Sequence, residues 1–163
     1  MSGERQALQQ LKNYMERSEI LKKFKPDMIN MLGILHELQN SNRQNYLEED
    51  DLKAVAEYLN TTYSHVYGVA TYYTMYSLKA RGRYIIRVCN SPVCDMEGAG
   101  SALKIVEEIL NIGVGETTTD GLFSLEHTEC LGRCSVAPSM LIGEDIYGEL
   151  NREKIVEILG KYK

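Results

Sequence analysis

The sequence predicts an α+β protein in which a helical N-terminal region precedes an α/β domain built around a four-stranded sheet. Two observations lead to this fold class. Apolar residues recur at helical spacing between Gln6 and Tyr76. From Tyr84 onwards, short β-rich segments alternate with helical segments and are separated by turn residues. We therefore expect two domains, a helical region at residues 1–80 and a sheet-containing domain at residues 81–163.

Four helices are expected in the first domain, because four segments carry apolar residues at helical spacing. In chain order they cover residues 6–15, 27–38, 48–59 and 61–73. Pro26 marks the start of the second helix, since proline is tolerated at a helix start but not in its interior. The acidic run from Glu48 to Asp51 suits the positive end of the helix dipole. Thr61 or Thr62 can cap the fourth helix.

The second domain is expected to contain four strands and two helices. The strands cover residues 84–88, 122–127, 139–142 and 146–150, and the helices cover residues 98–110 and 151–159. The segments 119–121 and 143–145 supply turns, and Asn151 can cap the last helix. Strands and helices in this order, within one short stretch of chain, imply a compact layered α/β structure.

The composition indicates a globular, cytoplasmic protein. Hydrophobic residues make up 44% of the 163 residues, which is enough to bury a core. A net charge of −5 without a basic patch argues against nucleic acid as a partner. The N-terminus lacks the apolar run of a secretory signal. The most apolar stretch, residues 28–35, is much shorter than the ~20 residues of a membrane span, so we expect no direct insertion into a membrane.

All four cysteines lie in two short segments. VCNSPVC (88–94) contains a C-x4-C pair, and ECLGRCSVAP (129–138) contains a C-x3-C pair. Structural disulfides are rare in the reducing cytosol, so paired thiols there favour metal binding first and redox catalysis second. Each segment is expected near the end of a strand, and loops at one end of a sheet can converge on one site. The candidate metal ligands are Cys89, Cys94, Cys130 and Cys134.

Three kinds of site could use these four cysteines. A [2Fe–2S] cluster takes two thiolates on each iron and needs loops that wrap its sulfurs. The loops here favour it, because Gly132 allows close backbone approach while Pro92 and Pro138 stiffen the chain. A structural zinc ion would instead make a zinc-stabilised interaction module without redox activity. A thiol–disulfide enzyme lacks support, since the chain has no C-x-x-C motif, and His127 is an unnecessary ligand beside four cysteines.

Longer motifs, both around the cysteines and elsewhere in the chain, resemble a family of NADH:quinone oxidoreductase subunits, the thioredoxin-like [2Fe–2S] ferredoxins. The resemblance extends from about residue 15 to the end of the chain. It rests on VYGVATYYTMY (66–76), VCNSPVCDMEGA (88–99), ETTTDGLFSLEHTECLGRCSVAP (116–138) and IYGEL (146–150). It implies a helical N-terminal part followed by a thioredoxin-like domain. By motif position it implies one [2Fe–2S] cluster bound by Cys89, Cys94, Cys130 and Cys134.

The same resemblance implies an electron-transfer function. Members of this family work beside a flavoprotein subunit that binds FMN and NADH, in respiratory complex I or in soluble hydrogenases and formate dehydrogenases, some of them electron-bifurcating. We therefore expect a non-catalytic electron-carrier subunit of an NAD(P)H-linked oxidoreductase complex, with further iron–sulfur subunits as partners. The chemistry on the nicotinamide belongs to the flavin, while this chain positions the cluster and sets its electrostatic surroundings.

Two residues depart from the usual pattern of the family, and both bear on the cluster potential and the partner surface. Glu97 stands where a basic residue is common, and Arg133 stands where a short residue is common. A group of tyrosines in the first domain admits two interpretations, a docking face for the partner or a helix core. The group consists of Tyr67, Tyr72, Tyr73 and Tyr76.

Overall fold

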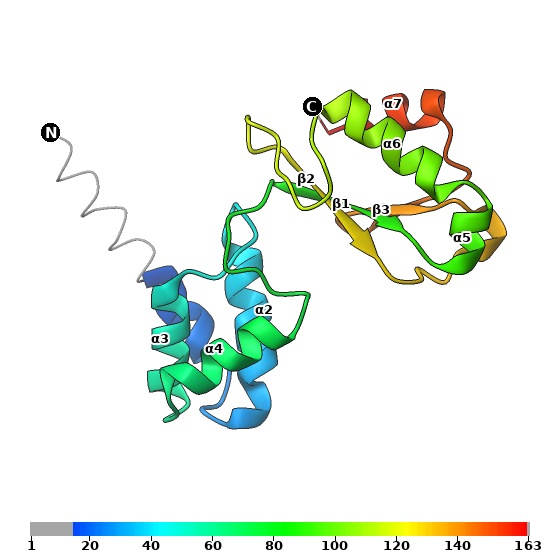
Figure 1. Cartoon of the computed structure of the whole chain (residues 1–163). Helices are drawn as coiled ribbons and strands as arrows, with labels where there is room; N and C mark the ends of the chain where they lie inside the picture. The colour runs from blue at the N-terminus through cyan, green and yellow to red at the C-terminus, as the bar shows by residue number, and fades with distance from the viewer. Residues whose placement is uncertain (1–14, 163) are drawn as a thin grey trace, which may run out of the picture. The chain divides into compact units, whose positions relative to one another are not determined.

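A computed structural model describes residues 15–162 of the chain (Figure 1). The chain divides into two compact units between Ala80 and Arg81. One unit has a core formed by helices, and the other has a core formed by a sheet and its covering helices. The expected α+β fold class is therefore confirmed. In the part of the chain that the structure describes, no helix has the length and apolar character needed to span a membrane.

The regular structure described in the N-terminal unit consists of helices joined by loops. Residues 15–22 are helical, and the elements that follow are η1 (Met28–Asn30), α2 (Met31–Ser41), α3 (Glu49–Tyr58) and α4 (Tyr63–Tyr72). The three helices predicted after Pro26 are confirmed, while most of the helix predicted at residues 6–15 lies outside the described residues. The second helix starts with the 3-10 turn η1, where the Asp27 carboxylate accepts a hydrogen bond from the Ile29 N–H at 3.0 Å.

Local capping explains where α3 and α4 begin. Glu48 and Asp51 form a reciprocal capping box, in which the Glu48 N–H donates to the Asp51 carboxylate at 2.8 Å. Of the two threonines that precede α4, Thr62 is the cap, because its hydroxyl accepts from the His65 N–H at 3.3 Å. The apolar faces of these helices meet in a core whose most buried members are Ile34, Leu35, Val55 and Val66.

The C-terminal unit alternates strands with helices. Its elements are β1 (Tyr84–Cys89), α5 (Pro92–Met96), α6 (Ala99–Leu110), β2 (Phe123–Thr128), η2 (Cys134–Val136), β3 (Met140–Ile142), β4 (Asp145–Tyr147) and α7 (Arg152–Gly160). The strands form one mixed sheet in the order β2-β1-β3-β4, with β1 parallel to β2 and antiparallel to β3. Figure 1 shows α6 and α7 side by side over this sheet, and both contribute buried residues to its core.

Two features of the C-terminal unit differ from the expectation. The segment after β1, expected as a stiff loop, contains the short helix α5 with Pro92 in its first turn, where proline is favoured because the missing N–H has no partner to lose. The strand predicted at residues 146–150 is shorter, since β4 ends at Tyr147. Gly148 then approaches Val136 so closely that a Cβ would clash with the Val136 carbonyl. The residue that follows β4 therefore packs closely against η2.

The tyrosines of the N-terminal unit divide between the core and the surface. Tyr76 is 6% exposed and its hydroxyl donates to the Leu32 carbonyl at 2.7 Å. Tyr67, Tyr72 and Tyr73 are exposed, with Tyr72 at 79%. The core interpretation therefore holds for Tyr76, and the other three side chains lie at the surface.

Candidate metal centre

The four cysteines come together at one end of the C-terminal unit. They occupy the end of β1, the helix α5, the loop after β2 and the start of η2, at Cys89, Cys94, Cys130 and Cys134. The parallel pairing of β1 with β2 places Cys89 opposite Thr128, so both strands end at the same edge of the sheet. A hydrogen bond from the Asn90 N–H to the Thr128 carbonyl (3.1 Å) continues this pairing into the two cysteine loops.

The first pair, Cys89 and Cys94, is buried. The two residues are 1% and 2% exposed and pack against Ala99. Burial acts to raise the pKa of the Cys89 thiol, but hydrogen bonds from the backbone N–H groups of Ser91 and Leu131 and from the Cys94 thiol outweigh it, so this pKa is lowered. A lowered pKa favours the thiolate, which is the form that binds a metal.

The second pair, Cys130 and Cys134, lies at the surface. Between them Gly132 has a φ of +70°, which glycine adopts without strain, and its N–H donates to the Cys130 sulfur at 3.4 Å. None of the four thiols, all of which lie within residues 15–162, forms a disulfide. The C-x3-C loop therefore holds two free sulfurs open to solvent.

Electrostatic interactions link the two pairs of thiols. The hydrogen bond to Cys130 and the negative charge of Cys130 raise the pKa of the Cys134 thiol, and the charges of Cys94 and Cys89 add to this effect. Mutual repulsion of this kind is expected when several thiolates share one site. A bound cationic centre relieves it, because metal ions favour the deprotonated sulfur.

This arrangement of sulfurs fits a binuclear iron–sulfur cluster. Each iron of a [2Fe–2S] cluster takes two protein thiolates, and the four thiols are arranged as two pairs. A cluster with four thiolates is negatively charged, so donors directed at its ligands stabilise it. Such donors lie at Cys89 and Cys130, and the Cys94 sulfur lies 3.6 Å from the Ser139 hydroxyl, where either atom can donate. Across residues 15–162, no three His, Cys, Asp or Glu side chains are grouped as ligands of one metal ion.

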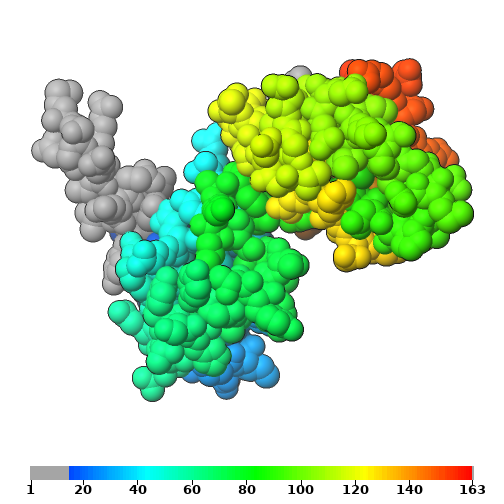
Figure 2. Space-filling view, in the orientation of Figure 1, coloured from blue at the N-terminus to red at the C-terminus, as the bar shows by residue number. Residues whose placement is uncertain are grey.

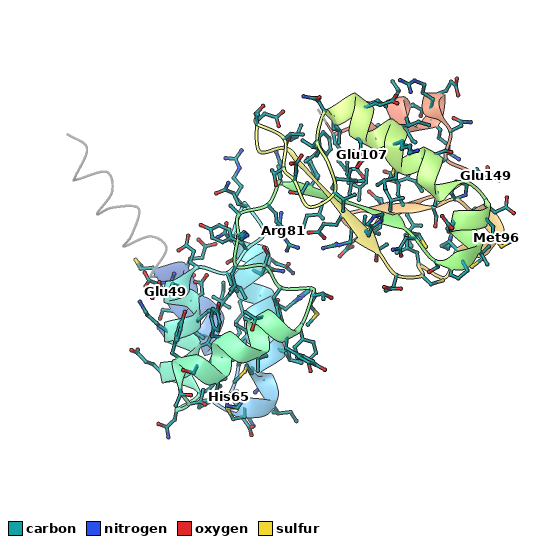
Figure 3. The ribbon with its side chains drawn as sticks, viewed as in Figure 1. Glu49, His65, Arg81, Met96, Glu107 and Glu149 are labelled. Carbon is teal, nitrogen blue, oxygen red and sulfur yellow. The ribbon has the colours of Figure 1, made fainter. Side chains whose placement is uncertain are left out.

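Apolar side chains are exposed beside the buried pair. Val93 and Met96 of α5 flank Cys94 and are 44% and 86% exposed. Figure 3 labels Met96 and Glu149 at the same end of the C-terminal unit. In Figure 2 the amber surface that follows β2 lies next to the green surface of α5. The region around the thiols therefore reaches the surface both through α5 and through the C-x3-C loop.

The structure places the remaining candidates at the surface and adds one residue that the sequence did not suggest. The side chains of His127, Glu97 and Arg133 are exposed. The added residue is Ser139, which is 1% exposed and has its hydroxyl 3.6 Å from the Cys94 sulfur. The sequence could have pointed to Ser139, because it is a polar residue next to the apolar strand segment that follows it. A buried polar residue usually has a specific hydrogen-bond partner.

Comparison with known proteins finds relatives along most of the chain. Residues 17–163 match the family model described as thioredoxin-like [2Fe-2S] ferredoxin. An NADH-quinone oxidoreductase subunit of Aquifex aeolicus is 39% identical over 132 residues, which cover 81% of this chain and 81% of that relative. The HndA subunit of the NADP-reducing hydrogenase of Solidesulfovibrio fructosivorans is 32% identical over 132 residues, which cover 81% of this chain and 76% of that relative.

A solved structure shares the fold. A chain in the crystal structure of an NAD+-reducing [NiFe]-hydrogenase in the air-oxidized state matches with a TM-score of 0.72 at 20% sequence identity, over 82% of this chain and 22% of that chain. At this identity the match shows the fold alone. The family model, in contrast, extends through both units and both cysteine segments. The family expected from the sequence motifs is thus confirmed: the chain belongs to the thioredoxin-like [2Fe–2S] ferredoxin family.

Proposed function

We propose that this chain is a non-catalytic electron-transfer subunit that carries one [2Fe–2S] cluster beside a flavin- and NADH-binding subunit. Cys89 and Cys94 would hold one iron, and Cys130 and Cys134 would hold the other. The observation that carries the proposal is the gathering of these four thiols as two pairs at one end of the sheet, with hydrogen-bond donors directed at Cys89 and Cys130 and a hydroxyl beside Cys94.

The protein supplies a different environment to each pair. When bound, a [2Fe–2S] cluster accepts and releases one electron at a time. The side chains packed around Cys89 and Cys94 exclude water from that side. Cys130 and Cys134 stay at the surface, where a redox group of a partner can approach. The ordered backbone around Gly132 keeps a donor on Cys130, so the surface ligand is held in place as well.

The relatives support a place in an NAD(P)H-linked complex. One is named as a subunit of an NADH-quinone oxidoreductase and another as a subunit of an NADP-reducing hydrogenase. A hydride donor delivers electrons in pairs, and a flavin can pass them singly to a cluster that lies close to it. We propose a flavoprotein that binds FMN and NAD(P)H as the direct partner, with further iron–sulfur subunits in a complex of respiratory, hydrogenase or formate dehydrogenase type.

Metal analysis tests the cluster. Protein purified anaerobically should be red-brown and contain about two irons and two acid-labile sulfides per chain. Cys→Ser replacement at each of the four positions should lose or damage the cluster, whereas His127→Ala should leave iron and sulfide unchanged. Stoichiometric zinc without labile sulfide, in protein made with ample iron, would favour the zinc-stabilised interaction module instead.

Activity and copurification test the assignment as a subunit. The isolated chain should not oxidise NADH with an artificial acceptor, because its sequence has no Gly-rich dinucleotide motif. A tagged chain purified from its native cells should bring down an NADH-binding flavoprotein. The catalytic subunit recovered with it would identify the complex. Robust NADH oxidation by the pure, flavin-free chain would overturn the assignment.

A further inference from the structure

Ser139 is a buried serine that directly contacts one of the candidate ligands. It precedes β3, and its carbonyl accepts a hydrogen bond from the Cys89 N–H at 3.1 Å. Its hydroxyl lies 3.6 Å from the Cys94 sulfur, which is within hydrogen-bonding range for an atom as large as sulfur. The backbone of Ser139 thus contacts one member of the buried pair, and its side chain contacts the other.

The direction of this hydrogen bond follows from the chemistry of a metal ligand. A free thiol can donate or accept, but a cysteine bound to iron is a thiolate and can only accept. Ser139 must then be the donor. The residue is 1% exposed, and within residues 15–162 no other hydrogen-bond partner of its hydroxyl is found. The low exposure keeps bulk water away from this hydroxyl.

We propose that Ser139 raises the reduction potential of the cluster by donating a hydrogen bond to the Cys94 sulfur, a role that rests on the proposed function. Reduction adds one electron to the cluster and makes its sulfurs more negative, so a donor stabilises the reduced state more than the oxidised state. No bond is broken, and the serine keeps its proton. The electron comes from the reduced flavin of the proposed partner or, in a titration, from a chemical reductant. Ser139 is a positioning residue and not a ligand.

The other serines near the thiols are less suitable for this test. Ser91 also bonds to Cys89, but through both its backbone and its side chain, and it is the N-cap residue of α5. Its replacement would disturb helix and sulfur together. Ser135 is exposed next to Cys134, where water can replace its hydroxyl. Ser139 alone among these three offers a single buried donor to a single sulfur.

The experiment compares the reduction potentials of the cluster-loaded full chain and its variants. Ser139→Ala removes one oxygen and keeps the Cβ, and it should change the ratio of reduced to oxidised cluster at a fixed potential by about three- to tenfold. This corresponds to a decrease of roughly 30 to 60 mV for one electron. Ser139→Thr retains the hydroxyl and should restore most of the wild-type potential. ENDOR spectra of the reduced protein should lose one exchangeable-proton coupling in Ser139→Ala only.

Ser124→Ala is the matched control. Ser124 is also buried in this sheet, at 3% exposure, but it bonds to Gly82 and Thr117 and lies opposite Ile85 in β1, away from the thiols. It should lower stability without moving the potential. A Ser139→Ala protein that carries its cluster, with an unchanged potential and unchanged exchangeable-proton couplings, would refute the role of Ser139 and leave the proposed function intact. A wild-type chain that binds no cluster would overturn both.

Discussion

At the scale of single residues, the four candidate ligands are all cysteines, but the surroundings of their sulfurs differ. Cys89 is 1% exposed and accepts hydrogen bonds from the backbone of Ser91 and Leu131. Cys134 is exposed, and the sulfur of Cys130 is its hydrogen-bond partner. The four thiols therefore give one shielded side and one solvent-facing side, and charged residues near the second side would act on a cluster bound there.

Arg133 is the charged residue within the C-x3-C loop, and we predict that it raises the cluster potential. A cation near the cluster favours the reduced, more negative form. Two unit charges about 8 Å apart interact by roughly 2 kcal/mol at an effective dielectric of ~20, and salt reduces this further. For one electron, ~59 mV corresponds to a tenfold change in the ratio of reduced to oxidised cluster. Arg133→Glu should therefore lower the potential by tens of millivolts, and Arg133→Ala by less.

The control for this prediction is Lys104→Glu, which makes the same change in net charge on the exposed side of α6. Its potential should stay within error of the wild type. Glu97→Arg should shift the potential upward if the side chain faces the cluster. If Arg133→Glu leaves the potential of the isolated chain unchanged and weakens only assembly with the flavoprotein, Arg133 belongs to the partner surface instead.

At the scale of elements, the backbone that follows the C-x3-C loop is held by the connection between β4 and α7. The Glu149 N–H donates to the Val136 carbonyl at 2.6 Å, and the Leu150 N–H donates to the Pro138 carbonyl at 3.3 Å. Gly148 makes this approach possible, because a Cβ there would clash with Val136. The segment between β4 and α7 therefore fixes the backbone that follows Cys134.

We predict that Gly148→Ala weakens cluster retention by displacing the backbone that follows Cys134. Overpacking of this kind costs about 1–3 kcal/mol, so the variant should unfold at a lower temperature and lose iron faster to a chelator. Gly100→Ala is the matched control, since a Cβ at this position in α6 meets no atom within 4 Å and alanine is favoured in helices. Equal rates of iron loss from the two variants would show that the contact with Val136 does not support the site.

Local signals predicted most elements, and tertiary contacts decided the rest. Asn151 was identified as a cap, and the cap of α4 was narrowed to Thr61 or Thr62, because the groups that the caps bond lie within three residues. The helix α5 was missed, since Pro92 suits a stiff loop and a first helical turn equally. The contact of Ser139 with Cys94 spans 45 residues, and no local pattern encodes such a contact. The sequence thus indicated the cysteines of the candidate site but not the residues packed around them.

At the scale of the whole molecule, the two units have separate cores, and all four cysteines lie in the second. The start of the second unit is tied to its own sheet. Arg81 pairs with Glu126 at 3.2 Å, and the Gly82 N–H donates to the Ser124 hydroxyl at 2.6 Å. A fragment that begins at Arg81 therefore keeps these contacts and the entire candidate site.

We predict that residues 81–163 assemble the cluster without the N-terminal unit. The fragment should contain the same iron and sulfide per chain as the full protein and have a similar potential. It should bind the flavoprotein less well, because the exposed side chains of Tyr67, Tyr72 and Tyr73 are lost with the N-terminal unit. Copurification with the tagged fragment and with the full chain measures the difference. A fragment that folds but takes up no iron would show that the site needs both units.

The central claim is that the two thiol pairs hold a redox-active binuclear cluster. A reductive titration of the anaerobic full chain, followed by EPR and by optical absorption, tests it most directly. We expect an EPR-silent oxidised protein that takes up about one electron per chain and then gives a paramagnetic signal of about one spin, with bleaching of the visible absorption. A colourless protein that stays EPR-silent on reduction, or one that takes up electrons in pairs through thiol–disulfide exchange, would contradict it.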